Sequence, residues 1–336
     1  MFHPDAVRQA MPPLDWNRPL PSAGPVDEYC RFYALDEERR QPGVFHGGGW
    51  FEAAGYRLMV HVFRPATSRG TVWILHGYLE HAGLWGRLLP QILRAGYAVL
   101  IFDLPGHGLS SGVRAGIGSF AEYQHILNDL LAAAEGRLPR PWRGVGQSTG
   151  GAILIEHVLA RAARDEPPAF DRAFLLAPLV LPTRFQWWQI RVAFWLIRAL
   201  RSGMPRNFRR NSSDGDFLNF VRHEDPLQAR WLPLSWVMAM KEWIAHVHRL
   251  PGCSFPVWAV QGGRDETVNG RYNLAFVRSR FHVERELFLP EASHQLANER
   301  DDLRAPLDTL LQAFLASGGG LDNPAIPATT GAPESR

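Results

Sequence analysis

Lysine is nearly absent from this chain of 336 residues, in which Lys241 stands alone and arginine carries almost all of the positive charge. Arginine suits bidentate contacts with phosphate or carboxylate groups, but the base composition of a GC-rich genome produces the same bias, and we prefer that explanation. A formal net charge of +3, without any block of like charge, is too mild to indicate nucleic-acid binding. We therefore expect no nucleic-acid partner.

Cysteine and long apolar runs are also scarce. Two cysteines, Cys30 and Cys253, do not make a disulfide framework in a chain of this length, and they fit a reducing compartment. Residues 1–10 lack the apolar core of a signal peptide, and no apolar stretch reaches the length of a membrane span. The composition, 46% hydrophobic and 21% charged, is that of a globular protein, and we expect it in the cytoplasm.

Apolar runs and amphipathic stretches alternate over residues 44–178 and 251–316. Strands are predicted at 44–51 and 56–63, which resemble a hairpin, and at 71–75, 97–102, 141–145, 173–177, 255–261 and 285–289. The short apolar runs at 71–75 and 97–102 are typical of buried parallel strands. Helices are predicted at 84–95, 120–136, 151–163, 271–278 and 305–316, the last with Pro306 in its first turn. This alternation predicts an α/β fold, with a mostly parallel sheet flanked by helices.

Three segments lie outside this alternation. Residues 1–43 are rich in proline and read as an irregular arm over the core. Residues 179–250 are rich in Trp, Arg and Pro and have helical spacing without strands, which predicts a helical cap inserted between core strands. Residues 317–336 have low complexity, and we expect a disordered tail.

Residues 146–150 read G-x-S-x-G, between a predicted strand and a predicted helix. So tight a turn forces strained backbone angles on Ser148 and lifts its Oγ above the sheet edge. Gly146 and Gly150 fit because a Cβ there would clash with the neighbouring strand and helix. The motif alone is equally consistent with a plain turn between two buried elements, so the remaining residues must decide.

A serine hydroxyl needs a histidine to accept its proton and a carboxylate to orient that histidine. Asp265 follows the predicted strand 255–261 at the edge of the sheet where ligands collect, and we prefer it to its neighbour Glu266. His294 follows the next strand, so the chain order is serine, acid, base. The H-x-H pair at 246–248 lacks further metal-ligand spacing and reads as cap surface, so we expect no metal and no other cofactor.

The oxyanion of such a reaction needs two N–H donors. One is the N–H of Thr149, directly after the serine. The second is expected from the loop after the strand 71–75, where we choose Tyr78, preceded by Gly77. The H-G-G-G run at 46–49 resembles a lipase motif that supplies such a donor, but it lies upstream, at the predicted hairpin, and not after the strand 71–75. We interpret it as a glycine-rich bend within a strand pair.

Four motifs together resemble one known group of enzymes. They are H-G-x-x-E-H at 76–81, D-x-x-G-H-G-x-S-x-G at 103–112, G-x-S-x-G-G at 146–151 and the histidine stretch at 294–299. The chain resembles the monoacylglycerol lipase and lysophospholipase group of serine α/β-hydrolases. The resemblance implies the α/β-hydrolase fold and a structural role for the loop at 103–112. The chain departs from the group at Gln147, Thr149 and Leu84, which leaves the substrate open.

The cap is the expected site of substrate selection. Arg184, Arg191 and Arg198 are spaced by seven, so on a helix they form one narrow stripe. Apart from this stripe, the predicted helix is apolar around nearly its whole circumference. Such a helix fits either packing on the core or contact with a lipid interface at the inner membrane. The residues predicted to contact substrate are Gly77, Gln147, Trp187, Trp188, Phe194 and Trp195.

These observations predict a serine hydrolase that cleaves carboxylic esters of lipid type, a monoacylglycerol or a lysophospholipid, through Ser148, His294 and Asp265 and an acyl-enzyme. An apolar cap suits an acyl chain better than a sugar or a peptide. An acyltransferase or a cofactor-free haloperoxidase-like enzyme on the same triad is the first alternative. A binding scaffold without catalysis is the second.

Overall fold

The computed structural model describes residues 2–183 and 203–318. Their centre is a nine-stranded sheet with the strand order β1-β2-β3-β5-β4-β6-β7-β10-β11. Its strands are β1 (Asp15–Pro19), β2 (Phe45–Ala53), β3 (Tyr56–Arg64), β4 (Thr71–Leu75), β5 (Ala98–Phe102), β6 (Trp142–Gln147), β7 (Arg172–Leu176), β10 (Pro256–Gly262) and β11 (His282–Leu289). A small second sheet pairs β8 (Gly203–Pro205) with β9 (Trp231–Pro233).

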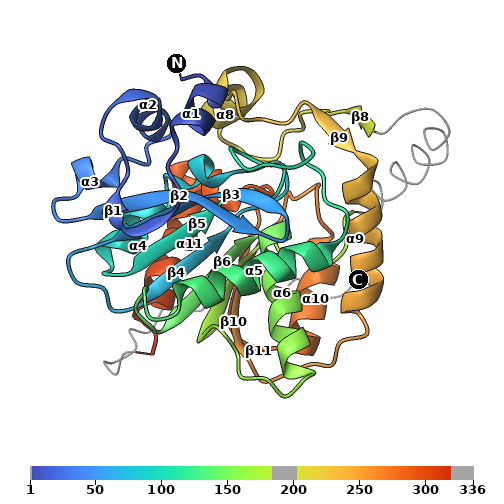
Figure 1. The fold of residues 1–336 in the computed structure, drawn as a ribbon. Coiled ribbons are helices and arrows are strands. Elements are labelled where there is room, and N and C mark those ends of the chain that lie inside the picture. The colour runs from blue at the N-terminus through green and yellow to red at the C-terminus, as the bar shows by residue number, and fades with distance from the viewer. Residues whose placement is uncertain (1, 184–202, 319–336) are drawn as a thin grey trace.

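Helices lie on both sides of the main sheet (Figure 1). The α-helices of the described residues are α1 (Pro4–Ala10), α2 (Gly24–Phe32), α3 (Glu37–Arg40), α4 (Leu89–Arg94), α5 (Phe120–Ala134), α6 (Thr149–Ala162), α8 (Gly215–Asn219), α9 (Leu234–Val247), α10 (Gly270–Arg280) and α11 (Asp301–Ala316). α4 contacts α11, while α5 contacts α6 and α9. A capping box of Ser119 and Glu122 starts α5.

The strands from β4 onward in the main sheet run parallel, whereas β1, β2 and β3 join antiparallel. The predicted class, a mostly parallel sheet flanked by helices, is confirmed. β4 and β5 are buried along their whole length, as their apolar sequences predict. Leu75 is in register with Gly146, and Gln147 with Leu176, so β4, β6 and β7 end at the same edge. Loops that follow these strands therefore meet there.

The first forty residues are not the irregular arm that their proline content suggests. They form α1, β1, α2 and α3, and β1 extends the main sheet by pairing with β2. Pro4 and Pro25 stand in the first turns of α1 and α2, where a missing N–H breaks no helical hydrogen bond. Val26 and Tyr29 are buried in the core. Proline here marks the starts of helices rather than disorder.

Two predicted helices differ most in their bounds from the observed ones. The stretch predicted as one helix over 84–95 is a 3₁₀ helix, Ala82–Trp85, followed by α4. Pro90, in the first turn of α4, has no N–H with which to continue a helix from the preceding residues. α11 begins at Asp301, so Pro306 lies inside the helix and the prediction that it stands in the first turn was wrong.

The glycine run at 46–49 lies within β2, as interpreted from the sequence. All of its residues pair with β3, in register from His46↔Phe63 to Gly49↔Val60. Gly49 has a φ of +143°, and a Cβ there would lie 2.5 Å from the carbonyl oxygen of Pro12. The run therefore lets the N-terminal segment approach β2 closely, which explains the glycines without a catalytic role.

Between β7 and β10 the chain leaves the main sheet. This segment, which we propose as the cap, contains β8, α8, β9 and α9 (Figure 1). The pairing of β8 with β9 overturns the expectation of a segment without strands. None of the helices within 2–183 and 203–318 is both long and apolar enough to cross a bilayer. The expected tail at 317–336 lies outside the described residues beyond position 318.

Candidate active site

Ser148 occupies the turn between β6 and α6 with φ 50° and ψ −110°, a region that residues with side chains rarely adopt. Its N–H donates to the carbonyl of Leu176 (2.9 Å), and its own carbonyl accepts from Leu179 N–H (3.0 Å). These bonds hold the strained turn against β7. The expected elbow conformation is present, and the serine side chain reaches a cavity at the edge of the sheet.

The two glycines of the motif are required by close approaches. A Cβ on Gly146 would lie 2.6 Å from the backbone of Gly150. A Cβ on Gly150 would collide with the carbonyl of Leu75 at the end of β4. Packing of α6 onto β4 and β6 thus depends on both residues being glycine.

The structure brings His294 and Asp265 together, each from a loop after its strand. His294 Nδ1 lies 2.7 Å from Asp265 Oδ2. Because an ionised carboxylate can only accept, Nδ1 carries the proton and the Nε2 lone pair is free to act as a base. The two side chains are only 5% and 2% exposed, which shields the bond from water.

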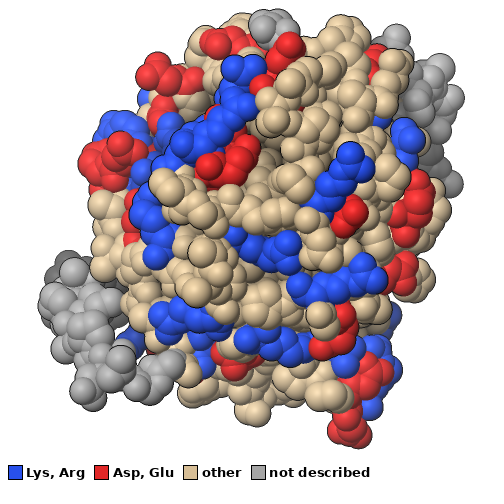
Figure 2. Space-filling model, turned by 60° about the vertical axis from the view of Figure 1, so that its left-hand side comes forward, with Lys and Arg blue, Asp and Glu red and all other residues tan. Residues whose placement is uncertain are grey.

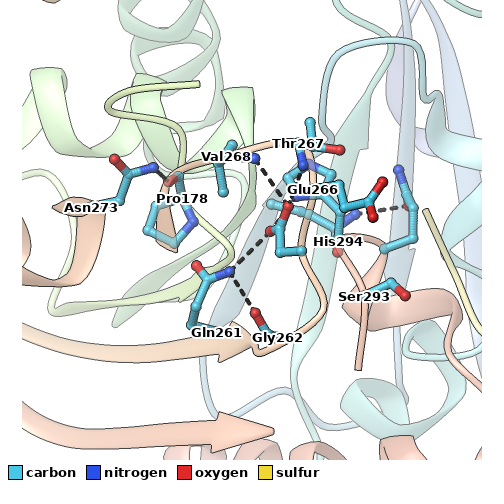
Figure 3. A network of polar contacts seen from close by, with 12 residues as sticks. Pro178, Gln261, Gly262, Glu266, Thr267, Val268, Asn273, Ser293 and His294 are labelled. Atoms are coloured by element: carbon cyan, nitrogen blue, oxygen red, sulfur yellow. Dashed lines mark hydrogen bonds and ion pairs between the residues drawn. The ribbon is translucent and has the colours of Figure 1, made fainter. Parts of the chain in front are cut away.

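Three further donors hold the Asp265 carboxylate. Gln261 Nε2 donates to Oδ2 (2.9 Å), and the N–H groups of Thr267 (2.7 Å) and Val268 (3.0 Å) donate to Oδ1. Figure 3 shows Gln261 near the end of β10, Thr267 and Val268 in the loop that follows it, and His294 from a separate loop. Glu266, the competing acid, points its backbone carbonyl toward the Thr183 hydroxyl.

These contacts set the charges of the pair. Burial would raise the pKa of Asp265, but His294 and the two N–H donors lower it below its ordinary value. Burial would lower the pKa of His294, but the carboxylates of Asp265 and Glu80 raise it above 6.5. A dissociated acid therefore faces an imidazole whose basicity is increased.

Ser148 and His294 line the same cavity, of about 940 Å³, together with Tyr78 and Thr149. Among the described residues, no hydrogen bond uses the N–H of Tyr78 or of Thr149. A Cβ on Gly77 would lie 3.2 Å from Ser148 Cβ, so the loop after β4 passes directly beside the serine. These two N–H groups are available to an oxyanion at that position.

Glu80 ties the loop after β4 to the loops of the other site residues. It accepts from Gly77 N–H (3.1 Å), from Gln147 Nε2 (2.7 Å) and from Gln295 Nε2 (2.7 Å). The Gln147 carboxamide oxygen in turn accepts from Ala297 N–H (3.3 Å). Gln147 was predicted to contact substrate, and its amide is instead engaged in this buried network.

Sequence reasoning gave Glu80 no role, although it belongs to the H-G-x-x-E-H motif. The sequence feature that could have indicated its role is the position of this glutamate three residues after Gly77, next to the buried strand 71–75. A carboxylate buried there needs several hydrogen-bond donors around it. Trp236 of α9 was also missed. Its ring stacks on Tyr78 at 3.7 Å between centroids, which places α9 over the loop after β4.

Four residues predicted to contact substrate lie outside the described residues: Trp187, Trp188, Phe194 and Trp195. The arginine stripe of the cap lies in the same segment. Described residues supply a mostly apolar wall of the cavity: Leu179, Met204, Leu218, Val221, Leu232, Leu234, Trp236, Val237, Met240 and Val268. The cavity therefore suits an apolar chain through described side chains alone.

The loop at 103–112 has a structural role in this chain. Asp103 accepts from the N–H groups of Ala82 (2.8 Å) and Leu109 (2.8 Å) and is fully buried. His76, from the loop after β4, accepts from Leu104 N–H through Nε2 (2.9 Å). The loop thus braces the segment that carries Gly77 and Tyr78.

Comparison with known proteins identifies the family of the chain. Residues 66–301 match the family model described as serine aminopeptidase, S33. The monoacylglycerol lipase of Mycolicibacterium smegmatis is 33% identical over 105 residues, which are 31% of this chain and only 38% of that enzyme. The monoglyceride lipase of Mus musculus is 24% identical over 255 residues, covering 73% of this chain and 81% of the relative.

Among solved structures, a soluble variant of the monoglyceride lipase from Saccharomyces cerevisiae, in complex with a substrate analogue, has a TM-score of 0.67 at 18% identity. It covers 80% of this chain and 93% of the yeast chain, and at this identity it shows the fold alone. The matched family segment, 66–301, contains the serine elbow and both partner loops. The chain therefore belongs to the family described as serine aminopeptidase, S33, and is a serine α/β-hydrolase of the monoacylglycerol lipase group.

Proposed function

We propose that this protein hydrolyses carboxylic esters of single-chain lipids, either monoacylglycerols or lysophospholipids. The observation that carries the proposal is the 2.7 Å bond between His294 and Asp265 at a cavity that Ser148, on its strained turn, also lines. The apolar wall of that cavity fits an acyl chain. The relatives named as monoacylglycerol and monoglyceride lipases agree with this substrate class.

In the acylation half of the reaction, Ser148 Oγ attacks the ester carbonyl while His294 Nε2 accepts its proton. Asp265 holds the imidazole in the required tautomer and stabilises the imidazolium. The N–H groups of Tyr78 and Thr149 receive the oxyanion, and loss of one such donor costs about 10²–10³ in kcat. Collapse of the tetrahedral intermediate expels the alcohol, which takes the proton from His294.

In the deacylation half, a water molecule gives a proton to His294 and attacks the acyl-enzyme carbonyl. A second tetrahedral intermediate forms in the same oxyanion site. It releases the fatty acid, and His294 returns the proton to Ser148. The balance requires only ester and water, so no redox partner enters the reaction.

The decisive experiment compares Ser148→Ala with Ser22→Ala, a control at an exposed serine in the N-terminal segment. We expect Ser148→Ala to fold normally but to lose turnover of a short p-nitrophenyl ester and labelling by a fluorophosphonate probe. Ser22→Ala should keep both. Full turnover in Ser148→Ala would reject the assignment of the nucleophile.

Product analysis separates hydrolysis from acyl transfer on the same residues. With monooleoylglycerol as substrate and a competing alcohol in the buffer, we expect free fatty acid as the main product. A dominant ester of the competing alcohol would identify an acyltransferase. Absence of fluorophosphonate labelling at Ser148 in the folded protein would favour a binding scaffold.

A further inference from the structure

The charged side chains that line the cavity are all of one sign. Arg206, Arg209, Arg210 and Arg222 line it, and no aspartate or glutamate does so among the described residues. The same bias is visible in the sequence. From Arg172 to Ser213 there are eight arginines and not one acidic residue. A cavity for a purely neutral lipid would not need this charge.

Three of the cap arginines gather around one aromatic ring, and we call Arg206, Arg222, Arg230 and Phe208 the Phe208 cluster. The guanidinium carbons lie 4.2 Å (Arg206), 6.0 Å (Arg222) and 4.9 Å (Arg230) from the Phe208 ring centroid. The backbone N–H of Arg206 donates to the carbonyl of Arg230 (2.9 Å), next to the pairing of β8 with β9. The cluster is therefore built into the framework of the cap segment.

The hydrogen-bond partners of these guanidinium groups are neutral. Arg206 donates to the Gln228 amide oxygen (2.5 Å) and the Ala229 carbonyl (3.2 Å). Arg222 donates to the Phe208 carbonyl (2.6 Å), and Arg230 donates to the Arg222 carbonyl. Within residues 2–183 and 203–318, no ion pair includes any of the three.

Some arginines elsewhere in the molecule are paired with a carboxylate. Arg31 pairs with Asp27 at 2.8 Å and Arg87 with Asp214 at 2.6 Å. Figure 2 shows acidic and basic side chains interspersed over one face of the molecule. The distinctive feature of the Phe208 cluster is that three guanidinium groups gather at one ring with no carboxylate of the described residues paired to any of them, whereas Arg64 stands singly over Phe45.

The nearest buried acid of the cap is already engaged. Asp225 accepts from His81 Nε2 (2.9 Å), from the Tyr33 hydroxyl and from Gln228 Nε2 (2.8 Å). Burial and the charge of Arg230 lower the pKa of Arg206 to about 10, so Arg206 remains cationic at neutral pH. The carboxylates of Asp225 and Glu80 partly oppose this lowering. Because neither of them forms an ion pair with the cluster among the described residues, an anionic ligand could still pair with its three guanidinium groups.

We propose that the Phe208 cluster binds the phosphate of a single-chain phospholipid whose acyl ester is cleaved at Ser148. The inference rests on the proposed hydrolase function and narrows its substrate to lipids with an anionic head group. Arg206 is half-buried and Arg222 is exposed, so the cluster extends from inside the cavity toward solvent. Planar guanidinium groups match phosphate oxygens in a bidentate manner, and the apolar wall receives the acyl chain.

A binding experiment tests this without requiring turnover. The probes are two ether lipids that no esterase cleaves, 1-O-octylglycerol 3-phosphate and 1-O-octylglycerol, used as monomers so that no charged micelle surface contributes. By calorimetric titration of the wild-type protein we expect the phosphate lipid to bind at least about tenfold more tightly. Equal affinities for the two lipids would overturn the inference.

Arg206→Gln and Arg222→Gln should each reduce that preference, and Arg94→Gln, an exposed arginine on α4 outside the cavity, should keep it. Arg206→Lys retains the positive charge but loses the planar guanidinium that can donate two hydrogen bonds to one phosphate. We therefore expect it to give an intermediate preference for the phosphate lipid. Thermal melting of every variant checks that the cap remains folded. A preference that survives in both glutamine variants would place the phosphate elsewhere and refute the cluster as its site.

Hydrolysis of the matching octanoyl esters then separates the two proposals. We expect kcat/KM for the phosphate ester to exceed that for the neutral ester, and Arg222→Gln to bring the ratio toward one, mainly through KM. Ser148-dependent cleavage with no preference for phosphate would refute the head-group inference and leave the hydrolase standing. Phosphate-dependent binding without any Ser148-dependent cleavage would refute the hydrolase and leave an anionic-lipid site.

Discussion

At the scale of single residues, the site depends on one carboxylate and one imidazole that change each other's proton affinity. Asp265 is held by three donors besides His294, so its negative charge is fixed in place. That charge, with a smaller contribution from Glu80, offsets the effect of burial on His294. The imidazole is therefore more basic than it would be in the same cavity without its partner.

The first prediction concerns pH. Only neutral His294 can accept the Ser148 proton, and its pKa is raised above 6.5. We therefore expect kcat/KM for a neutral ester to fall with decreasing pH, with a midpoint above 6.5. A pH–rate profile with an uncharged substrate measures this midpoint. A midpoint below the value of free imidazole would contradict the raised basicity.

Substitution of the acid gives the second prediction. Asp265→Asn removes the charge and favours the wrong tautomer of His294, so we expect kcat to fall by about 10⁴. The acid limb of the pH profile should also move to lower pH. Glu266→Gln, at the exposed neighbour that the sequence offers as a rival, is the control and should retain full kcat. Loss of activity in the control instead would reverse the two assignments.

Residue types and order were enough to propose Ser148, Asp265 and His294, because each follows a buried strand and such loops meet at one edge. Glu80, Gln295 and Trp236 could not be assigned a role in the same way. Their role arises from contacts between segments more than 60 positions apart, such as Gln147 with Glu80 and Gln295. No local pattern encodes such contacts.

At the scale of elements, the approach of α6 to β4 limits what the elbow tolerates. Gly150→Ala would drive a methyl group into the Leu75 carbonyl, and the backbone there has no flexible end that can move aside. We expect a loss of about 3 kcal/mol in the free energy of unfolding. Urea titration measures the loss. Gly215→Ala, at an open helical position in α8, is the matched control and should change stability little.

The cap segment is joined to the core by the buried pair His81–Asp225, at 2.9 Å. Burial would raise the pKa of Asp225, but His81 and hydrogen bonds lower it to about 2. Burial would lower the pKa of His81, but Asp225 raises it above 6.5. The contribution of Asp225 to stability is fully present above the pKa that this carboxyl has in the unfolded chain, and it is lost as the pH falls toward 2. The contribution of His81 is fully present below pH 6.5, and it is lost as the pH rises through the raised pKa of the folded protein.

It follows that the pair stabilises the fold most between about pH 4 and pH 6.5. We expect Asp225→Asn to lower the free energy of unfolding by about 3 kcal/mol in this range, and by less at alkaline pH. Urea titrations at several pH values provide the measurement. Asp216→Asn, at an exposed acid of α8, serves as the control. A loss that grows with increasing pH would contradict the raised pKa of His81.

At the scale of the whole molecule, the fold class and the positions of the core strands along the chain follow from the alternation of apolar runs and amphipathic stretches. The structure of the N-terminal segment could not be predicted in this way. Its place in the sheet depends on the pairing of β1 with β2, and no pattern within residues 1–43 indicates that pairing. The pairing of β8 with β9 was not predicted for the same reason, because it joins segments that are separate in the sequence. The break before α4 differs, because Pro90 is a local signal that the predicted helix over 84–95 did not take into account.

The N-terminal segment provides a prediction at this scale. Deletion of residues 1–43 would expose the edge of β2 and the side chains that pack on Tyr29 and Trp16, which are buried. We expect the shortened chain to aggregate, because a free sheet edge invites pairing with another molecule. Size-exclusion chromatography measures this. A full-length chain with Asn17→Ala and Arg18→Ala, two exposed positions of β1, should remain monodisperse if the wild type is.

The hydrogen bond from Tyr33 to Asp225 has a consequence for the order of events during synthesis. A ribosome produces Tyr33 192 residues before it reaches Asp225. Arg143 likewise precedes Phe314 and Leu315, whose carbonyls its guanidinium binds, by 171 and 172 residues. The cavity is therefore completed late, because His294 and Gln295, which line it, are translated long after Ser148. A product that terminates before His294 would contain the serine without the imidazole that lines the same cavity.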